Sequence, residues 1–122
     1  MKNLNKNIGN YAEKLASDYL IHHHYKIIER NFRNNLGEID IICIKSKILI
    51  IVEVKGRYNL SYGKPQEAVN YIKQKSLIKV ASSYINYKNL YNFNVRFDVI
   101  EVFFNNDNSL YEINHIKDAF RL

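Results

Sequence analysis

The 122-residue sequence has no tryptophan, and cysteine, proline and methionine occur once each. The single cysteine, Cys43, can form neither an internal disulfide nor a thiolate metal cluster, which excludes oxidative cross-links and a structural zinc site. The longest uninterrupted apolar run, residues 48–52, is far shorter than the roughly 18 residues of a membrane-spanning helix. The first ten residues are too polar for the apolar centre of a signal peptide. The sequence therefore predicts a cytoplasmic protein with no membrane segment.

Hydrophobic residues make up 47% of the chain and charged residues 25%, which is ordinary usage for a globular protein. This composition predicts a packed core and excludes intrinsic disorder. A chain of this length is too short to divide its core, so we expect one domain over residues 1–122.

Positive charge is concentrated in one part of the chain. The formal net charge is +6 and the pI is near 9.4. From Lys55 to Arg96 there are eight basic residues and one acid, Glu67, so this stretch carries +7 and the remainder −1. A basic surface of this kind fits a polyanion such as nucleic acid. The alternative is a lysine-rich helix exposed to solvent, and charge alone favours that alternative.

Hydrophobic periodicity predicts two helices and five strands in the order αβββαββ, which is an α/β fold. Apolar residues at helical spacing predict a helix over residues 4–21. Pro65 suits the start of a second helix that ends at about residue 87. The expected strands are residues 25–31, 38–44, 48–55, 95–104 and 110–116, with a polar turn at 32–37 and a loop at 56–65. Residues 38–44 and 48–55 are separated by a short polar turn, so we expect them to pair as an antiparallel hairpin.

Two acidic residues of this hairpin are expected to face each other. If its turn is centred between Ser46 and Lys47, paired positions sum to 93 and Asp40 lies opposite Glu53. Such partners lie on one side of a sheet, with their Cα atoms roughly 4.5 to 5.5 Å apart. Two carboxylates this close repel by ~3 kcal/mol at an effective dielectric constant near 20. A divalent cation removes the repulsion, and carboxylate oxygens suit Mg²⁺ or Mn²⁺.

Lys55 lies two residues after Glu53 on the same face, where it would stand beside a scissile phosphate. The alternative is that Asp40, Glu53 and Lys55 pair with one another on a wet surface. Spacing alone favours this alternative, because a carboxylate followed later by E-x-K is common in unrelated chains. The neighbouring residues argue against this alternative. Leu49 and Ile51 lie on the same face as Glu53, so the charged residues interrupt an apolar surface.

Glu13 is a candidate third acid of the same site. On the first helix Gly9, Glu13, Ala16 and Leu20 follow one another at spacings of four, three and four, so a carboxylate lies among small and apolar neighbours. The alternative is a solvent-facing glutamate at the edge of the apolar stripe. If Glu13 does approach the hairpin acids, the cleft is expected to open towards Arg57 and the lysines of the second helix.

Several short motifs follow one another along nearly the whole chain. They are Gly9, Glu13 and Ala16; Arg30, Asn31 and Arg33; Gly37-Glu38-Ile39-Asp40; Val52-Glu53-Val54-Lys55 with Arg57; Gly63, Pro65, Ala68 and Lys73; Arg96-Phe97-Asp98-Val99; and Ala119-Phe120. In these motifs the sequence resembles the YraN-like family, small bacterial proteins related to Holliday junction resolvases within the PD-(D/E)XK nuclease superfamily.

The resemblance implies a restriction-endonuclease-like, resolvase-like core in which a mixed sheet is flanked by helices. It implies that Asp40 and Glu53 are metal ligands, that Lys55 is the catalytic lysine, and that Glu13 is the helix acid that completes the site. Resolvase-like relatives act as dimers, so the resemblance also points to a homodimer, for which the sequence shows no interface.

Residues and resemblance together predict an endonuclease that uses Mg²⁺ or Mn²⁺ to hydrolyse phosphodiester bonds of DNA, with branched or otherwise structured DNA as the favoured substrate. The residues expected to bind DNA are Arg30, Arg33, Arg57, Lys64, Lys73, Lys75 and Lys79. Two alternatives remain: a nucleic-acid-binding protein of the same fold without turnover, and a protein-interaction module whose basic face recognises an acidic partner. Metal-dependent cleavage of DNA would separate the first hypothesis from both.

Overall fold

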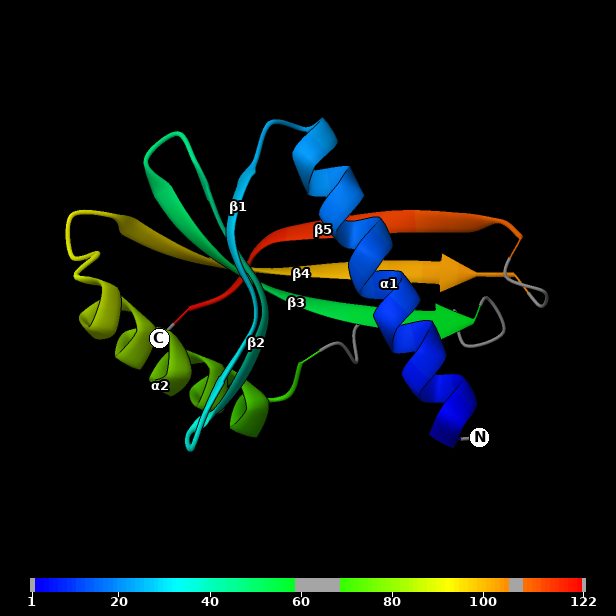
Figure 1. Cartoon of the computed structure of the whole chain (residues 1–122), viewed down its shortest axis with the longest axis horizontal. Coiled ribbons are helices and arrows are strands. Elements are labelled where there is room, and N and C mark those ends of the chain that lie inside the picture. The colour runs from blue at the N-terminus through cyan, green and yellow to red at the C-terminus, as the bar shows by residue number, and fades with distance from the viewer. Residues whose placement is uncertain (1, 59–68, 106–108, 122) are drawn as a thin grey trace.

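The computed structural model describes residues 2–58, 69–105 and 109–121, with side chains described from residue 9 onward. The order of two helices and five strands is as expected (Figure 1). The elements are α1 (Lys2–His22), β1 (Lys26–Asn34), β2 (Gly37–Lys45), β3 (Ile48–Tyr58), α2 (Tyr71–Lys88), β4 (Asn94–Phe104) and β5 (Tyr111–Phe120). Within the described ranges, neither helix is both long and apolar enough to cross a membrane.

The five strands form one mixed sheet in the order β1-β2-β3-β4-β5. The pairs β1–β2, β2–β3 and β4–β5 are antiparallel. The central pair β3–β4 is parallel. Parallel neighbours need a long crossover connection, and the chain from β3 to β4 supplies one that contains α2. The expected α/β class with a mixed sheet is therefore confirmed.

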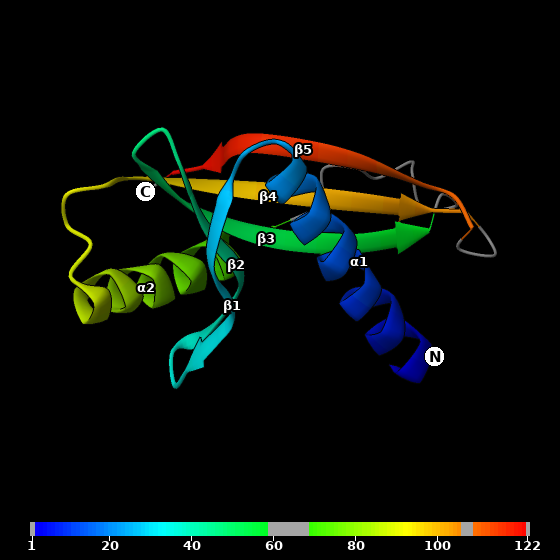
Figure 2. The ribbon, with the colours of Figure 1, turned by 45° about the horizontal axis from the view of Figure 1, so that its top comes forward.

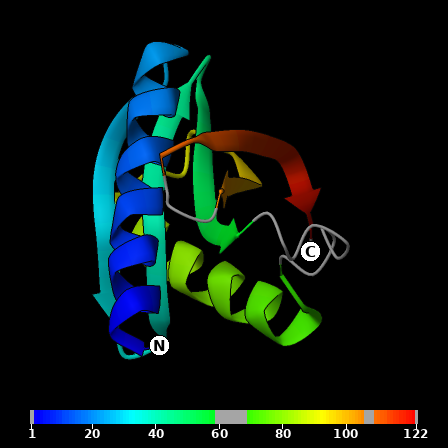
Figure 3. The same ribbon diagram turned by 90° about the vertical axis from the view of Figure 1, so that its right-hand side faces the viewer.

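Each helix packs against a different set of strand residues, and the views in Figures 2 and 3 show the two helices on different sides of the strands. Along β3, Ile50 and Val52 belong to the buried cluster that contains residues of α1. Leu49 and Ile51 belong to the cluster that contains residues of α2. Both faces of β3 are thus buried, which explains its near-continuous apolar sequence.

The expected hairpin register is present from Ile41 to Lys45, but the ladder ends before the expected pair of Asp40 with Glu53. The pairs of β2 and β3 run from Ile41 with Val52 to Lys45 with Ile48, so each pair sums to 93. Ser46 and Lys47 form the turn with φ of 52° and 64°, as the two central residues of a type I′ hairpin require.

Strands β2 and β3 separate at the other end of this ladder. The last pair there is Ile41 with Val52, whereas β2 stays paired with β1 as far as Gly37. Figure 2 shows the β1–β2 hairpin leaving β3 in this region. Ile39 packs with α2 residues but Ile41 packs with α1 residues, so the simple alternation of faces breaks at Asp40. We call this point, formed by Asp40 on β2 and Glu53 and Val54 on β3, the fork.

Four element boundaries differ from the sequence expectation. Strand β3 continues to Tyr58, three residues into the expected loop at 56–65. Strand β1 continues to Asn34 instead of turning at residue 32, because Phe32 pairs with Ile39 and its ring lies 4.8 Å from that of Tyr84 on α2. Helix α2 begins at Tyr71, where the Asn70 side chain accepts the first-turn N–H of Lys73. Strand β5 runs beyond residue 116 to Phe120, whose ring stacks on Phe97 at 5.0 Å. The expected helix start at Pro65 lies outside the described residues.

Candidate active site

Three carboxylates from three elements meet at the fork. Asp40 lies on β2, Glu53 on β3 and Glu13 on α1. The charge of Asp40 raises the pKa of both Glu13 and Glu53, which shows that its carboxylate lies near both. We call these three residues the acid cluster. The structure thus brings together the three acids that the sequence singled out.

Separation of the two strands positions Asp40. The backbone N–H of Val54 donates to Asp40 Oδ2 at 2.8 Å. This bond holds the carboxylate over the gap between β2 and β3. Asn31 supports Glu13 through a side-chain hydrogen bond, from a left-handed backbone conformation with φ of 53°. Sequence reasoning quoted Asn31 in a motif but gave it no role, because only the fold places it beside α1.

The acid cluster is held in a setting that disfavours negative charge. The pKa of Glu53 is raised to about 7, first by burial and then by the Asp40 carboxylate. The pKa of Glu13 is also raised to about 7, by burial and then by Asp40 and Glu38. Burial raises the pKa of Asp40 as well, although the Val54 N–H acts against the rise. Near neutral pH the cluster therefore retains protons that a bound cation would displace.

Two lysines face Glu53. Lys55 Nζ lies 3.9 Å from Glu53 Oε2. Lys73 Nζ, from the first turn of α2, lies 3.7 Å from the same oxygen. Lys55 stands where the sequence placed it, whereas Lys73 was expected on the DNA-binding surface and instead reaches the acids.

A cleft of about 260 Å³ between α1 and β1 reaches two of the three acids, Glu13 and Asp40. Its walls also include Ser17, Arg30 and Asn31. This cleft opens beside Arg30. An opening towards Arg57 and the lysines of α2 stays a prediction.

The expected DNA-binding residues fall into different settings. Arg30, Lys75 and Lys79 are exposed, and Lys75 Nζ lies 5.3 Å from the centre of the Tyr71 ring. Arg33 is exposed and pairs with Glu38 at 3.3 Å. Lys64 lies outside the described residues.

Arg57 corrects the sequence interpretation, because it points into the fold. Its side chain is 15% exposed and its Nε lies 3.4 Å from Oε2 of the fully buried Glu101 on β4. A buried carboxylate needs a counter-charge, and Arg57 supplies it. Arg57 therefore stabilises the parallel pair β3–β4 and does not belong to the exposed basic surface.

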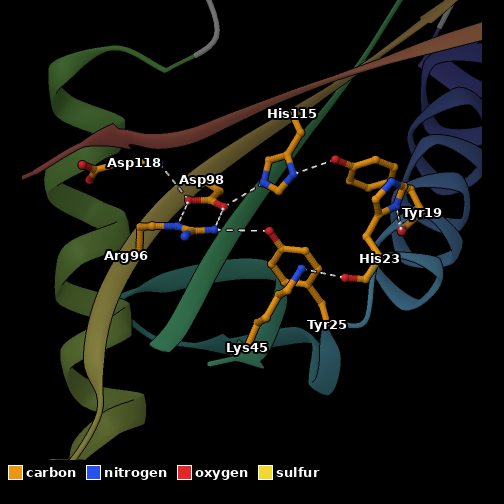
Figure 4. A network of polar contacts seen from close by, with 8 residues as sticks. All are labelled: Tyr19, His23, Tyr25, Lys45, Arg96, Asp98, His115 and Asp118. Atoms are coloured by element: carbon orange, nitrogen blue, oxygen red, sulfur yellow. Dashed lines mark hydrogen bonds and ion pairs between the residues drawn. The ribbon is translucent and has the colours of Figure 1, made fainter. Parts of the chain in front are cut away.

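Arg96 and Asp98 of the Arg96-Phe97-Asp98-Val99 motif belong to a polar network that does not include the acid cluster residues (Figure 4). Arg96 donates to both oxygens of Asp98 at 2.8 Å. His115 Nε2 lies 2.7 Å from Asp98 Oδ2, and its Nδ1 lies 2.9 Å from the Tyr19 hydroxyl. The backbone N–H of Asp118 also donates to Asp98. The network joins α1, β4 and β5, so Arg96 too contributes to the fold.

The donor set at the fork suits a hard divalent cation. Among the described residues, no three His, Cys, Asp or Glu side chains are arranged as a complete set of metal ligands. Mg²⁺ does not require such a set, because it is bound through one or two carboxylates together with water and substrate phosphate. Asp40 and Glu53, which lie near enough for Asp40 to raise the pKa of Glu53, provide two carboxylates of this kind.

Fold and site together define an α/β protein with an acid cluster and two lysines at the fork of a five-stranded mixed sheet. The chain belongs to the uncharacterised protein family UPF0102, the YraN-like family, whose sequence model matches residues 12–102. This range includes the acid cluster and both lysines.

The chain is 69% identical over 121 residues to a protein of Clostridium botulinum strain Eklund 17B, with 99% of each chain covered. It is 62% identical to one from Clostridium beijerinckii, over 100% of this chain and 99% of the relative, and 50% identical to one from Clostridium tetani, with both chains fully covered.

Proposed function

We propose that the protein is a metal-dependent endonuclease of the resolvase-like PD-(D/E)XK type, with a restriction-endonuclease-like fold, that hydrolyses phosphodiester bonds of branched or structured DNA. The observation that carries the proposal is the meeting of Asp40, Glu53 and Lys55 at the fork. Neighbouring acids that are buried or half-buried, with a lysine beside one of them and a cleft at another, are typical of a catalytic centre.

Each residue of the centre has a distinct part in this proposal. Asp40 and Glu53 would hold Mg²⁺ or Mn²⁺, and Glu13 completes the acidic set from α1. A bound divalent cation supplies Lewis-acid chemistry: it offsets phosphate charge and acidifies water. The Lys55 ammonium, beside Glu53, offsets the negative charge that develops on the phosphoryl oxygens. Glu13, whose pKa is raised to about 7, is suited to exchange a proton at neutral pH.

A second candidate is a DNA-binding protein of the same fold without turnover. It is favoured by the lack of a complete three-residue metal-ligand set within the described ranges and by the two lysines that already face Glu53. In this case Lys55 and Lys73 would be permanent counter-ions of the acid cluster.

Cleavage of labelled linear, flap and four-way DNAs tests the proposal. Wild-type protein with Mg²⁺ or Mn²⁺ should cut at least one of them, and EDTA should stop the reaction. Asp40→Asn and Glu53→Gln should each lower the rate by at least ~100-fold, because each removes a ligand at the centre of the site. Glu112→Gln, an exposed position on β5, is the matched control and should cut like wild type. Binding of these DNAs without cleavage under any condition would overturn the nuclease and leave the second candidate.

A further inference from the structure

Two positive charges converge on one buried oxygen at the fork. Glu53 has a side chain that is 9% exposed, and its Oε2 faces the ammonium groups of Lys55 at 3.9 Å and Lys73 at 3.7 Å. Both distances exceed a close hydrogen bond, so each lysine balances the carboxylate electrostatically without being hydrogen-bonded to it.

The two lysines are held differently. Lys55 lies within β3, in a residue pair with Glu101 of β4, and its side chain is 34% exposed. Lys73 lies in the first turn of α2, and its side chain, at 40%, is the more exposed of the two. Its backbone N–H is bound by the Asn70 cap, which fixes the backbone but leaves the long side chain free to change its rotamer.

We infer that Lys73 is a positioning residue of the fork: in the metal-free protein its ammonium stands in for a divalent cation beside Glu53, and it turns outward to a DNA phosphate when the cation binds. This inference rests on the proposed function and adds to it a lysine that links metal binding to substrate binding.

The physical reason is competition between like charges. A divalent cation bound by Glu53 would lie within a few ångströms of both ammonium groups and repel them. The Lys73 side chain is the more exposed of the two, at 40% against 34%, so Lys73 is the group expected to move. Once released, the Lys73 ammonium lies in the first turn of α2, two residues before the exposed Lys75. Removal of Lys73 should then strengthen metal binding and weaken DNA binding, which are opposite effects.

Isothermal titration of the metal-free protein with Mn²⁺ tests the exchange. Lys73→Gln should bind Mn²⁺ about 5- to 20-fold more tightly than wild type, since a competing cation is removed from a partly screened site. Lys79→Gln removes the same charge from an exposed position of the same helix and should change the affinity less than about 2-fold. Lys73→Arg should stay close to wild type. Equal Mn²⁺ affinities of Lys73→Gln and Lys79→Gln would overturn the exchange.

Thermal unfolding in EDTA tests the counter-ion role without metal. Lys73→Gln should melt about 2–5 °C below Lys79→Gln, because Glu53 loses half of its facing positive charge. Equal melting temperatures would show that Lys73 does not support Glu53. If wild-type protein binds no Mn²⁺, the proposed nuclease and the exchange both fail, while the melting comparison still decides whether Lys73 is a counter-ion.

Discussion

The surroundings of Asp40 and Glu53 disfavour the ionised form of each carboxyl group. Glu53 is buried and Asp40 is half-buried, and burial is the largest cause of the rise in the pKa of each. If the two acids had only a structural role, replacing one of them with a neutral residue would make the fold more stable, because it would remove a buried charge. Their arrangement is therefore costly to the metal-free fold, which is the pattern expected of a site kept for binding or chemistry.

Stability of the metal-free protein should decrease as pH rises from about 5 to 8. The folded pKa of Glu53 is about 7, above its ordinary 4.5, so in this window the folded state binds more protons than the unfolded state and loses stability as pH rises. In Glu53→Gln the decrease should be smaller by about 1 to 3 kcal/mol. Urea unfolding at pH 5 and pH 8 in EDTA measures it. An unchanged pH dependence in Glu53→Gln would contradict the assigned environment.

The pKa of Asp98 is shifted downwards, in the direction opposite to that of Glu53. Burial acts to raise its pKa, but hydrogen bonds from His115 and Arg96 outweigh it and hold the pKa below its ordinary value. The stabilisation is therefore present at neutral pH and is lost as pH falls through the folded pKa. Asp98→Asn should destabilise by about 2 to 4 kcal/mol at pH 7, since the buried His115 and Arg96 lose their partner. Chemical denaturation measures this, with the exposed Asp118→Asn as control. A loss no larger than that of the control would mean that the network does not stabilise the fold.

The β2–β3 hairpin shows how far sequence reasoning reaches. Two β-branched runs and the polar turn at Ser46 and Lys47 are local signals, and they predicted the register correctly. The break in alternation at Asp40 is not local, because it depends on β2 following β1 away from β3. The approach of Lys73 to Glu53 and the inward turn of Arg57 depend in the same way on long-range packing, so no spacing in the sequence predicts them.

Helix α2 begins at Tyr71 because the Asn70 side chain provides the cap, a signal that the sequence interpretation did not use. The expected start at Pro65 lies outside the described residues. Asn70→Ala should destabilise the protein by about 1 kcal/mol, the usual cost of a lost N-cap. Urea denaturation measures it, and Asn92→Ala, exposed between α2 and β4, is the matched control. If Asn70→Ala and Asn92→Ala have equal free energies of unfolding, Asn70 is not the effective N-cap of α2.

The distribution of charge over the molecule changes the expected DNA interface. Of the eight basic residues from Lys55 to Arg96, Arg57 and Arg96 pair with buried acids. Lys55 and Lys73 face the acid cluster. Lysines 75, 79 and 88 are exposed on α2, and Lys64 lies outside the described residues. Under the proposed function, these three lysines and Arg30 at the cleft are the charges expected to contact DNA.

Salt dependence of DNA binding tests this interface. If about four phosphates are neutralised, log K against log salt should have a slope of about −3 to −4, since each contact contributes about −0.9. The double variant Lys75→Gln/Lys79→Gln should reduce the magnitude of the slope by about 2. The double variant Lys26→Gln/Lys117→Gln removes the same charge from exposed positions on β1 and β5 and should leave the slope nearly unchanged. Fluorescence anisotropy in EDTA, where no cleavage occurs, measures all three proteins. Equal slopes in the two double variants would show that α2 does not face the DNA, and a flat response in wild type would argue against nucleic acid as the partner.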